Sequence, residues 1–255
     1  MNIQQKTQTL SEYIANAQYI VFFGGAGVST ESGIPDFRSA GGVFAEKKYD
    51  APPEVMLSRT YFFKHPDKFY EFYKDKMLHP DAKPNDAHKA LAYLERIGKL
   101  KAVITQNVDN LHQCAGSRTV IELHGSVSRN FCRKCKKSFD LSYIIDSEGT
   151  PKCDNIECGG IIKPDVVLYE EPLNEKLAIS AISHISAADM LIVGGTSLAV
   201  YPAAHYISYF GRNQKATDSR SVIINKSTTY HDDSFDLAIH EDSIGNILRQ
   251  VVKLL

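Results

Sequence analysis

Four of the five cysteines form two pairs with the spacing of a metal site. Two residues lie between Cys132 and Cys135, four lie between Cys153 and Cys158, and 17 separate the pairs. Such pairs commonly hold tetrahedral Zn²⁺, and four thiolate ligands leave no open position for water. Buried cysteines acting as small apolar residues are the alternative, which the charged neighbours disfavour. We therefore expect one structural zinc ion, with the lone Cys114 in the core.

A glycine-rich turn at residues 25–27 follows a short apolar run at 17–23. Glycines in this context let the backbone approach a pyrophosphate, which the N-terminus of a following helix attracts. Thr30 replaces the third glycine of the dinucleotide motif, so the turn alone could be an ordinary strand–helix connection. Residues 29–39 include Gly, Pro and a compact Asp36-Phe37-Arg38 sequence, which favours a loop that covers a ligand.

Further polar clusters follow apolar runs at residues 105–109 (TQNVD) and 194–198 (GGTSL). Ligands bind at the carboxyl ends of the strands in open α/β sheets. A helix cap would need only one of Asn107 and Asp109, so the first cluster indicates a ligand clamp. A lone histidine is usually an ordinary residue, but the glycine after His124 and the nearby cysteine pairs favour a functional role.

Alternating strand and helix patterns must position these groups. Apolar runs rich in β-branched residues predict strands at 17–23, 100–105, 189–195, 221–225 and 237–240. Helical spacing follows Asn85 as far as Gly98 and recurs at 177–187 and 244–252. Strands interleaved with helices predict an α/β fold with a doubly wound parallel sheet of the dinucleotide-binding type.

Two segments interrupt this alternation. Residues 126–164 contain the four paired cysteines and no long apolar run, and are predicted to form a small inserted zinc-binding domain. Residues 40–84 are rich in Tyr, Phe and Pro, which favours short helices and a mobile loop belonging to the small domain. The large domain would then comprise residues 1–39, 85–125 and 165–255.

The composition argues against several classes of partner. With 29 basic and 30 acidic residues among 255, the net charge of −1 provides no field for direct nucleic-acid binding. The longest apolar stretch, 19–28, is interrupted by glycines and far shorter than the roughly 20 residues that cross a bilayer. Without a recognisable secretory signal, we expect a cytoplasmic monomer with no membrane partner.

Together these motifs resemble those of the sirtuins, the NAD-dependent protein deacylases, and most closely those of Gram-positive bacteria. The matching blocks, in family order, are GAGVSTESGIPDFRS (25–39), TQNVDNLHQCAG (105–116), ELHGS (122–126), the four cysteines, KPDVV (163–167), GGTSL (194–198) and INKS (224–227). They span nearly the whole chain. The resemblance implies a Rossmann-like large domain and a small zinc domain, with NAD and an acyl-lysine peptide meeting between them.

The resemblance also implies roles for individual residues. His124 would be the catalytic base, and Asn107 and Asp109 would hold the carboxamide of nicotinamide. NAD would be contacted by Ala26, Thr30, Asp36, Phe37, Arg38, Gln106, Val108, Asp109, Thr196, Ser197, Asn225 and Ile244. The peptide would pair with Val166, Val167, Leu168 and Tyr169. The expected products are free lysine, nicotinamide and O-acyl-ADP-ribose.

The chain departs from the family pattern at several positions. Asn110 and Glu170 stand where the family usually has glycine, and the polar loop at 212–220 is longer than usual. Sirtuins that favour acidic acyl groups resemble one another in a Tyr-x-x-Arg pair, whereas here Lys76 follows Tyr73. Because lysine lacks the planar fork of arginine, we expect a preference for neutral acyl groups. Alternatively, Tyr73 belongs to the core and Lys76 to the surface.

Three other functions remain open at this point. An ADP-ribosyltransferase could use the same NAD site, but sirtuin-like chains of that kind tend to lack the catalytic histidine. A non-catalytic module that senses NAD would keep the binding residues alone. A hydride-transferring dehydrogenase is disfavoured by Thr30 in the glycine motif and by the closed zinc coordination.

Overall fold

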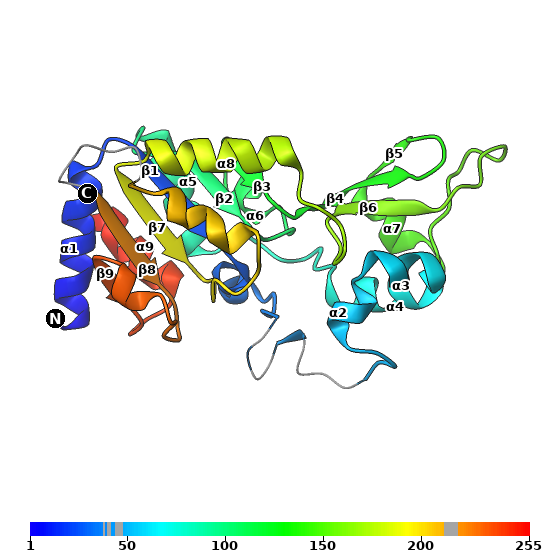
Figure 1. Cartoon of the computed structure of the whole chain (residues 1–255), viewed down its shortest axis with the longest axis horizontal. Coiled ribbons are helices and arrows are strands. Elements are labelled where there is room, and N and C mark those ends of the chain that lie inside the picture. Colours follow the sequence, from blue (N-terminus) through cyan, green and yellow to red (C-terminus); the bar gives the residue numbers. More distant parts are fainter. Residues whose placement is uncertain (38, 40–41, 44–47, 212–218) are drawn as a thin grey trace.

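The computed structural model describes residues 1–37, 39, 42–43, 48–211 and 219–255. Arg38 therefore lies outside the described residues, as do positions 212–218 of the long polar loop and parts of the predicted mobile loop, at 40–41 and 44–47. The chain forms a larger and a smaller lobe (Figure 1). Among the described residues, no helix is both long enough and apolar enough to cross a membrane.

The larger lobe is built on a parallel sheet, as predicted, and this sheet has six strands where five were expected. Its strands are β1 (Ile20–Gly24), β2 (Leu100–Thr105), β3 (Val120–Glu122), β7 (Met190–Gly194), β8 (Arg220–Ile224) and β9 (Leu237–Ile239). They lie in the order β3-β2-β1-β7-β8-β9. From β1 the chain adds β2 and β3 on one side of the sheet and then β7, β8 and β9 on the other. The strand order therefore reverses between β1 and β7, and ligands of doubly wound folds bind at such a switch point.

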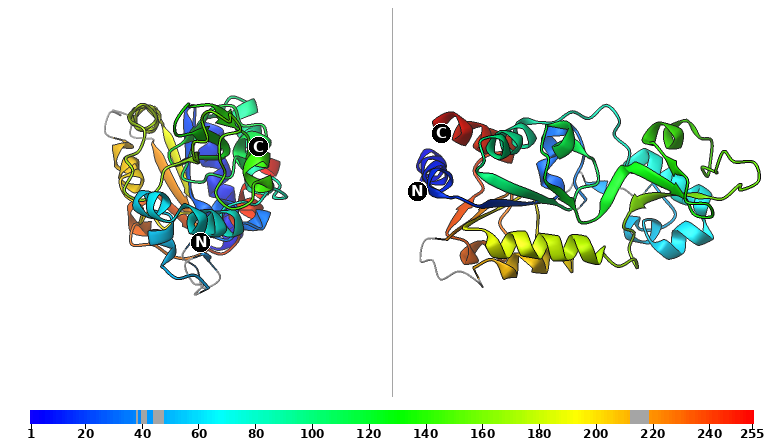
Figure 2. Two further views of the ribbon diagram at one scale, coloured as in Figure 1. Left: turned by 90° about the vertical axis from the view of Figure 1, so that its right-hand side faces the viewer. Right: turned by 90° about the horizontal axis from the view of Figure 1, so that it is seen from above.

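Helices cover both faces of this sheet because successive strand residues point to opposite sides. Ile20 and Phe22 belong to one core cluster, Val21 and Phe23 to another, and all four are fully buried. The first cluster includes residues of α1 (Ile3–Asn16), α5 (Asp86–Arg96) and α9 (Ile244–Leu254). The second includes α8 (Glu175–Ala187) and the 3₁₀ helix Ala203–Tyr209. Figure 2 shows the two layers on opposite sides of the sheet.

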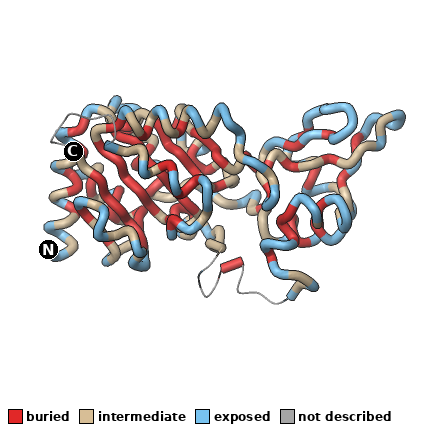
Figure 3. The backbone as a smooth tube through the Cα atoms, viewed as in Figure 1, coloured by how far each residue is buried: buried red, intermediate tan, exposed pale blue. Residues whose placement is uncertain are grey.

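The smaller lobe has its own sheet and core. Its antiparallel strands β4 (Gly125–Cys132), β5 (Ser138–Phe139) and β6 (Ile162–Val166) lie in the order β5-β4-β6. Its helices are α2 (Pro53–Met56), α3 (Arg59–Lys64), α4 (Pro66–Lys76) and α7 (Leu141–Asp146). Aromatic residues of α4 pack with Ile162 of β6 in a core separate from that of the larger lobe. Figure 3 shows buried backbone inside each lobe.

The predicted strands and helices of the larger lobe are present, and α1 and β3 are among its elements that were not predicted. The side-chain oxygen of Asn85 accepts hydrogen bonds from the N–H groups of Ala87 and His88, so the predicted cap begins α5. Helix α1 was missed because its first half is polar and few of its residues are buried. Strand β3 was missed because it has only three residues at the sheet edge.

Candidate active site

A cavity of about 1380 Å³ lies between the two lobes, at the carboxyl ends of β1, β2 and β7. This volume exceeds the ~300–1,000 Å³ of typical small-molecule pockets and suits a dinucleotide together with a peptide side chain. The sequence-predicted residues that line it are Ala26, Thr30, Asp36, Phe37, Gln106, Asn107, Val108, Asp109, His124, Val166, Val167, Leu168, Tyr169, Thr196, Ser197, Asn225 and Ile244.

Two glycine turns form the floor of the cavity at the switch point. The N–H of Gly25 donates to the carbonyl of Gly194 (3.1 Å), and the N–H of Gly27 donates to that of Gly195 (2.8 Å). A Cβ on Gly27 would lie 2.8 Å from the Cα of Gly195, so the turns pack closely only as glycines. Short 3₁₀ turns at Ala26–Val28 and Thr30–Ser32 follow, in place of the expected α-helix, because Gly33 turns the chain with a φ of 82°. The N-terminus of an α-helix is thus not available to attract a pyrophosphate here.

Thr196 and Asn225 form a reciprocal clamp at the ends of β7 and β8. The side-chain oxygen of Asn225 accepts from the Thr196 N–H, and its amide donates to the Thr196 carbonyl, both at 2.9 Å. The amide of Gln106, at the end of β2, donates to Oγ1 of Thr196 (3.1 Å). Side chains that follow β2, β7 and β8 are therefore held in fixed orientations at the carboxyl edge of the sheet.

Ser29 connects Asn107 and Asp109, the two residues after β2 that were predicted to hold a ligand. Its hydroxyl donates to Oδ2 of Asp109 (2.6 Å) and accepts from the amide of Asn107 (3.0 Å). Oδ1 of Asp109 accepts from the N–H of Leu111 (2.9 Å), the first residue of α6 (Leu111–Cys114). Asn110 adopts the left-handed conformation that asparagine tolerates, with a φ of 66°, so the turn forms without glycine. Ser29 lies within the matched 25–39 block but was not singled out from the sequence.

His124 is oriented by a backbone hydrogen bond. Its Nδ1 lies 2.9 Å from the carbonyl oxygen of Gln106, which can only accept, so Nδ1 carries the proton. The neutral ring then presents an unprotonated Nε2. Burial lowers the pKa of His124, an effect that the hydrogen bond to Gln106 partly offsets. The histidine is therefore neutral near pH 7 and can accept a proton inside the cavity.

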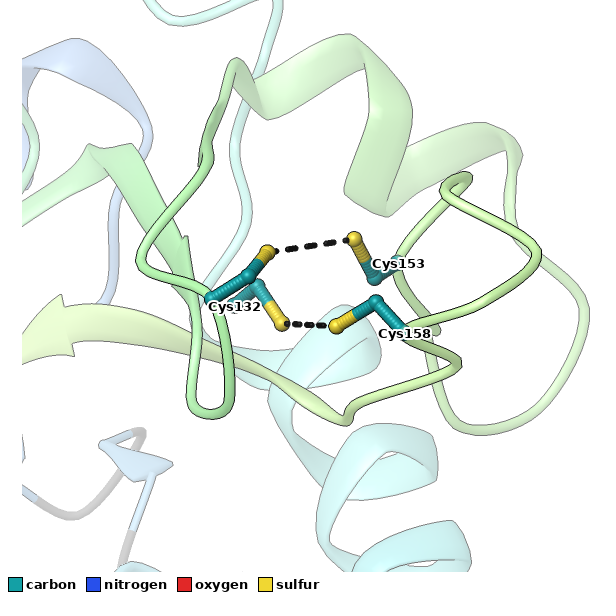
Figure 4. A group of neighbouring side chains, drawn as sticks. Cys132, Cys153 and Cys158 are labelled. Carbon is teal, nitrogen blue, oxygen red and sulfur yellow. Dashed lines mark hydrogen bonds between the residues drawn. The ribbon is translucent and has the colours of Figure 1, made fainter.

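The four paired cysteines converge at the far end of the smaller lobe. Sγ of Cys132 lies 3.5 Å from that of Cys158, Sγ of Cys135 lies 3.6 Å from that of Cys153, and all four atoms are within 4.8 Å of one another. Four thiolates at about 2.3 Å from a zinc ion would be about 3.8 Å apart, so the set fits tetrahedral Zn²⁺. Figure 4 shows the sulfur atoms facing one another.

The surroundings of the cysteines are consistent with a closed structural site. A Cβ on Gly160 would lie 2.8 Å from Sγ of Cys132, so the second turn can approach the first only with glycine there. Lys137 forms an ion pair with Asp154 at 2.7 Å beside the site. The basic residues are therefore partly neutralised by neighbouring carboxylates.

Two residues are placed differently from their prediction. Tyr73 was a candidate contact of the acyl group, but the alternative core position is the one observed: it is fully buried, stacks on Phe69 with ring centroids 5.4 Å apart, and is not among the residues lining the cavity. The face of α4 that it shares with other aromatic residues packs inward, which corrects the expectation. Cys114 was expected in the core, but it is exposed and lines the cavity because α6 lies at its edge.

The cavity also has an apolar part that the sequence did not indicate. It is lined by residues of the smaller lobe that include Leu57, Met77, Val127 and Leu141, with Lys76 beside them. These residues come from four separate segments, and only the packing of the small lobe brings them together.

Comparisons with known proteins agree with this site. A model described as the Sir2 family matches residues 25–202. The chain is 55% identical over 251 residues to an NAD-dependent protein deacetylase of Clostridium perfringens, covering 98% of this chain and 100% of the relative. It is 50% identical over 246 residues to an NAD-dependent protein deacetylase of Cutibacterium acnes, covering 96% of each.

Solved structures with the same fold include complexes. One described as Sir2–p53 peptide–NAD⁺ has a TM-score of 0.83 and 35% identity, covering 100% of this chain and 98% of the other. Another, Sir2Tm bound to a propionylated peptide, has a TM-score of 0.83 and 35% identity, covering 98% of each. On the family match, the close relatives and the shared fold, the chain belongs to the Sir2 family, the sirtuins.

Proposed function

We propose that this chain is an NAD-dependent protein lysine deacetylase, which removes acyl groups from lysine side chains. The observation that supports this most directly is the state of His124, which lines the cavity. The hydrogen bond of its Nδ1 to Gln106 leaves Nε2 as the basic nitrogen. The relatives named above are NAD-dependent protein deacetylases. The products are free lysine, nicotinamide and O-acyl-ADP-ribose.

The residues of the cavity divide the work of the reaction. NAD supplies the ribose carbon that receives the acyl oxygen and the nicotinamide that leaves. Asn107 and Asp109, fixed by Ser29, hold the carboxamide of nicotinamide, and Phe37 shields the reacting carbon from water. The neutral imidazole of His124 would act as a general base, taking a proton from a ribose hydroxyl onto Nε2 so that the hydroxyl oxygen attacks the acyl carbon. The bond from that carbon to the lysine nitrogen then breaks, and water completes O-acyl-ADP-ribose.

The remaining predicted contacts are assigned to NAD by their place in the cavity. Ala26 and Thr30 lie on the first glycine turn and its extension, and Thr196 and Asn225 form the clamp that packs against this turn. Gly25 and Gly27 leave the backbone of the floor open to the pyrophosphate. Cys132, Cys135, Cys153 and Cys158 would hold a structural zinc, and four thiolate ligands would leave no open position for chemistry on it.

The acyl group is assigned to the apolar part of the cavity, and a neutral chain fits it best. Leu57, Met77 and Leu141 offer no hydrogen-bond donor to a carboxylate from their side chains. The ammonium of Lys76 lies 3.2 Å from a carboxylate oxygen of Asp75, which offsets its charge. A solved relative binds a propionylated peptide, whose acyl group is also neutral.

The product of the reaction provides the test. The purified chain is incubated with NAD and an acetyl-lysine peptide, and the nucleotide product is analysed by mass spectrometry. O-acetyl-ADP-ribose with one equivalent of nicotinamide supports the proposal. ADP-ribose attached to the peptide or the enzyme would instead indicate a transferase, and no release of nicotinamide would indicate a module that only binds NAD.

We also propose a large NAD-binding domain formed by residues 1–39, 85–125 and 165–255. The small domain would comprise a helical part at 40–84 and the zinc-binding module at 126–164. We further propose that the protein is a cytoplasmic monomer. Thiolate ligands for zinc persist in a reducing compartment, which supports the location. A mass near the 28.4 kDa of one chain by light scattering would agree with a monomer.

A further inference from the structure

The segment that follows β6 forms one wall of the cavity and is fastened to its surroundings. The N–H of Val167 donates to the carbonyl of His124 (2.9 Å). The N–H of Tyr169 donates to the carbonyl of Leu57 (3.0 Å), and its own carbonyl accepts from the N–H of Arg59 (2.9 Å). The position of this wall therefore depends on the connection between α2 and α3.

Glu170, the next residue, occupies an unusual backbone conformation. Its φ of 72° lies in the left-handed region, which residues other than glycine rarely adopt. Its side-chain Oε2 accepts from both the N–H (2.9 Å) and the hydroxyl (2.6 Å) of Thr60 in α3. These hydrogen bonds, with Arg59 nearby, lower the pKa of Glu170, so the carboxylate stays ionised at neutral pH. The side chain thus holds the backbone in a conformation that it would otherwise leave.

We propose that Glu170 is a positioning residue for the acyl-lysine peptide, an inference that rests on the proposed function. It lines the cavity immediately after Val166, Val167, Leu168 and Tyr169, the proposed pairing edge. The N–H groups of Val167 and Tyr169 already donate within the chain, and that of Leu168 donates to Oε2 of Glu171 (3.0 Å), so a bound peptide depends on where this wall lies and not on those N–H groups. Because Glu170 fastens the end of this segment to α3 before the peptide binds, less conformational entropy of the segment is lost on binding.

A positioning role is separable from a structural one. Glu170 is exposed, so its removal leaves no cavity in the core. The NAD side of the site, including Thr196 and Asn225, is held by hydrogen bonds that do not involve it. We therefore expect the effect to appear in peptide binding and to leave NAD binding and overall stability nearly unchanged.

The experiment compares steady-state constants of the full chain with an acetyl-lysine peptide and NAD. In Glu170→Ala, the KM for peptide should rise about three- to tenfold, with the KM for NAD within about twofold of wild type. Glu170→Gly relieves the backbone strain but lacks the carboxylate, so its KM for peptide should also rise. Glu170→Gln keeps an acceptor oxygen and should retain most of the wild-type affinity. Glu148→Ala, at an exposed glutamate of the same lobe that does not line the cavity, is the matched control.

A double-mutant cycle identifies the partner. Thr60→Val removes the hydroxyl donor, and adding it to Glu170→Ala should raise the KM for peptide no further. An unchanged KM for peptide in both Glu170→Ala and Glu170→Gly overturns the proposal, as does an equal loss in every constant together with the melting temperature. If the wild-type chain releases no nicotinamide with peptide, the proposed function and this inference fail together; if it does, an unchanged variant refutes the positioning role alone.

Discussion

Replacing Ser29 with alanine tests the polar network that holds Asn107 and Asp109 in the cavity. The Ser29 side chain is almost completely buried and bridges Asn107 and Asp109. In Ser29→Ala, the amide of Asn107 loses the acceptor that orients it, and Asp109 loses one of its two donors. The carboxylate stays anchored through Oδ1 to the N–H of Leu111, so it should not swing out of the site.

The size of the effect follows from the bond that is removed. The hydroxyl and the carboxylate are 2.6 Å apart, the short distance of a charge-assisted hydrogen bond. Hydrogen bonds to charged groups contribute about 1.5–3 kcal/mol, so kcat/KM for NAD should fall about 10- to 150-fold. Because the network is assigned to nicotinamide, exchange of free nicotinamide should fall in parallel while the KM for peptide changes little.

The assay measures nicotinamide release against NAD concentration at saturating acetyl-lysine peptide. Ser32→Ala is the matched control. Ser32 lies in the same segment as Ser29, but its Oγ accepts a hydrogen bond from the amide of Asn85 (3.0 Å) and not from the residues assigned to nicotinamide. Thermal unfolding of both variants shows whether the fold is intact. A folded Ser29→Ala chain with kcat/KM within about threefold of wild type would refute the reasoning. An equal loss in Ser32→Ala would assign the effect to the segment as a whole.

The other predictions concern the base, the metal and the acyl group. His124→Ala should lose about 10²–10⁴-fold in deacetylation while NAD still binds by calorimetry, and near-normal turnover would sink the assigned role. Burial lowers the pKa of His124 and its neutral form is the base, so kcat/KM of the wild type should persist as the pH falls to about 6.5 and decline only below it; a midpoint at or above that value contradicts the assignment. Cys153→Ser should lose the zinc equivalent by metal analysis and lower the melting temperature, since metal binding is coupled to folding of the small lobe, and zinc that survives the substitution would argue against the site. With matched peptides, the specificity constant for acetyl-lysine should exceed that for succinyl-lysine, and the opposite order would contradict the preference for neutral acyl groups.

Local patterns in the sequence were enough to predict much of the architecture. The apolar run at 100–105 coincides with β2, and Asn85 caps α5, because strand burial and helix capping depend on neighbouring residues. The spacing of the cysteine pairs predicted their convergence, since short turns bring the members of a pair together. The ordered motifs also predicted the residues that line the cavity, with Tyr73 as the exception among the described positions.

What the tertiary structure alone decided involves residues far apart in the chain. The hydrogen bond between Ser29 and Asp109 joins residues 80 positions apart, and the one between Glu170 and Thr60 joins residues 110 positions apart. The protonated nitrogen of His124 is set by the carbonyl of Gln106, which the sequence places no nearer than many others. Composition and periodicity indicate which faces of an element are buried, but they do not indicate which polar atoms of distant segments form hydrogen bonds. The sequence therefore determined the sheet, the cysteine pairs and the family, whereas the packing of segments far apart in the chain decided how the site is oriented and held.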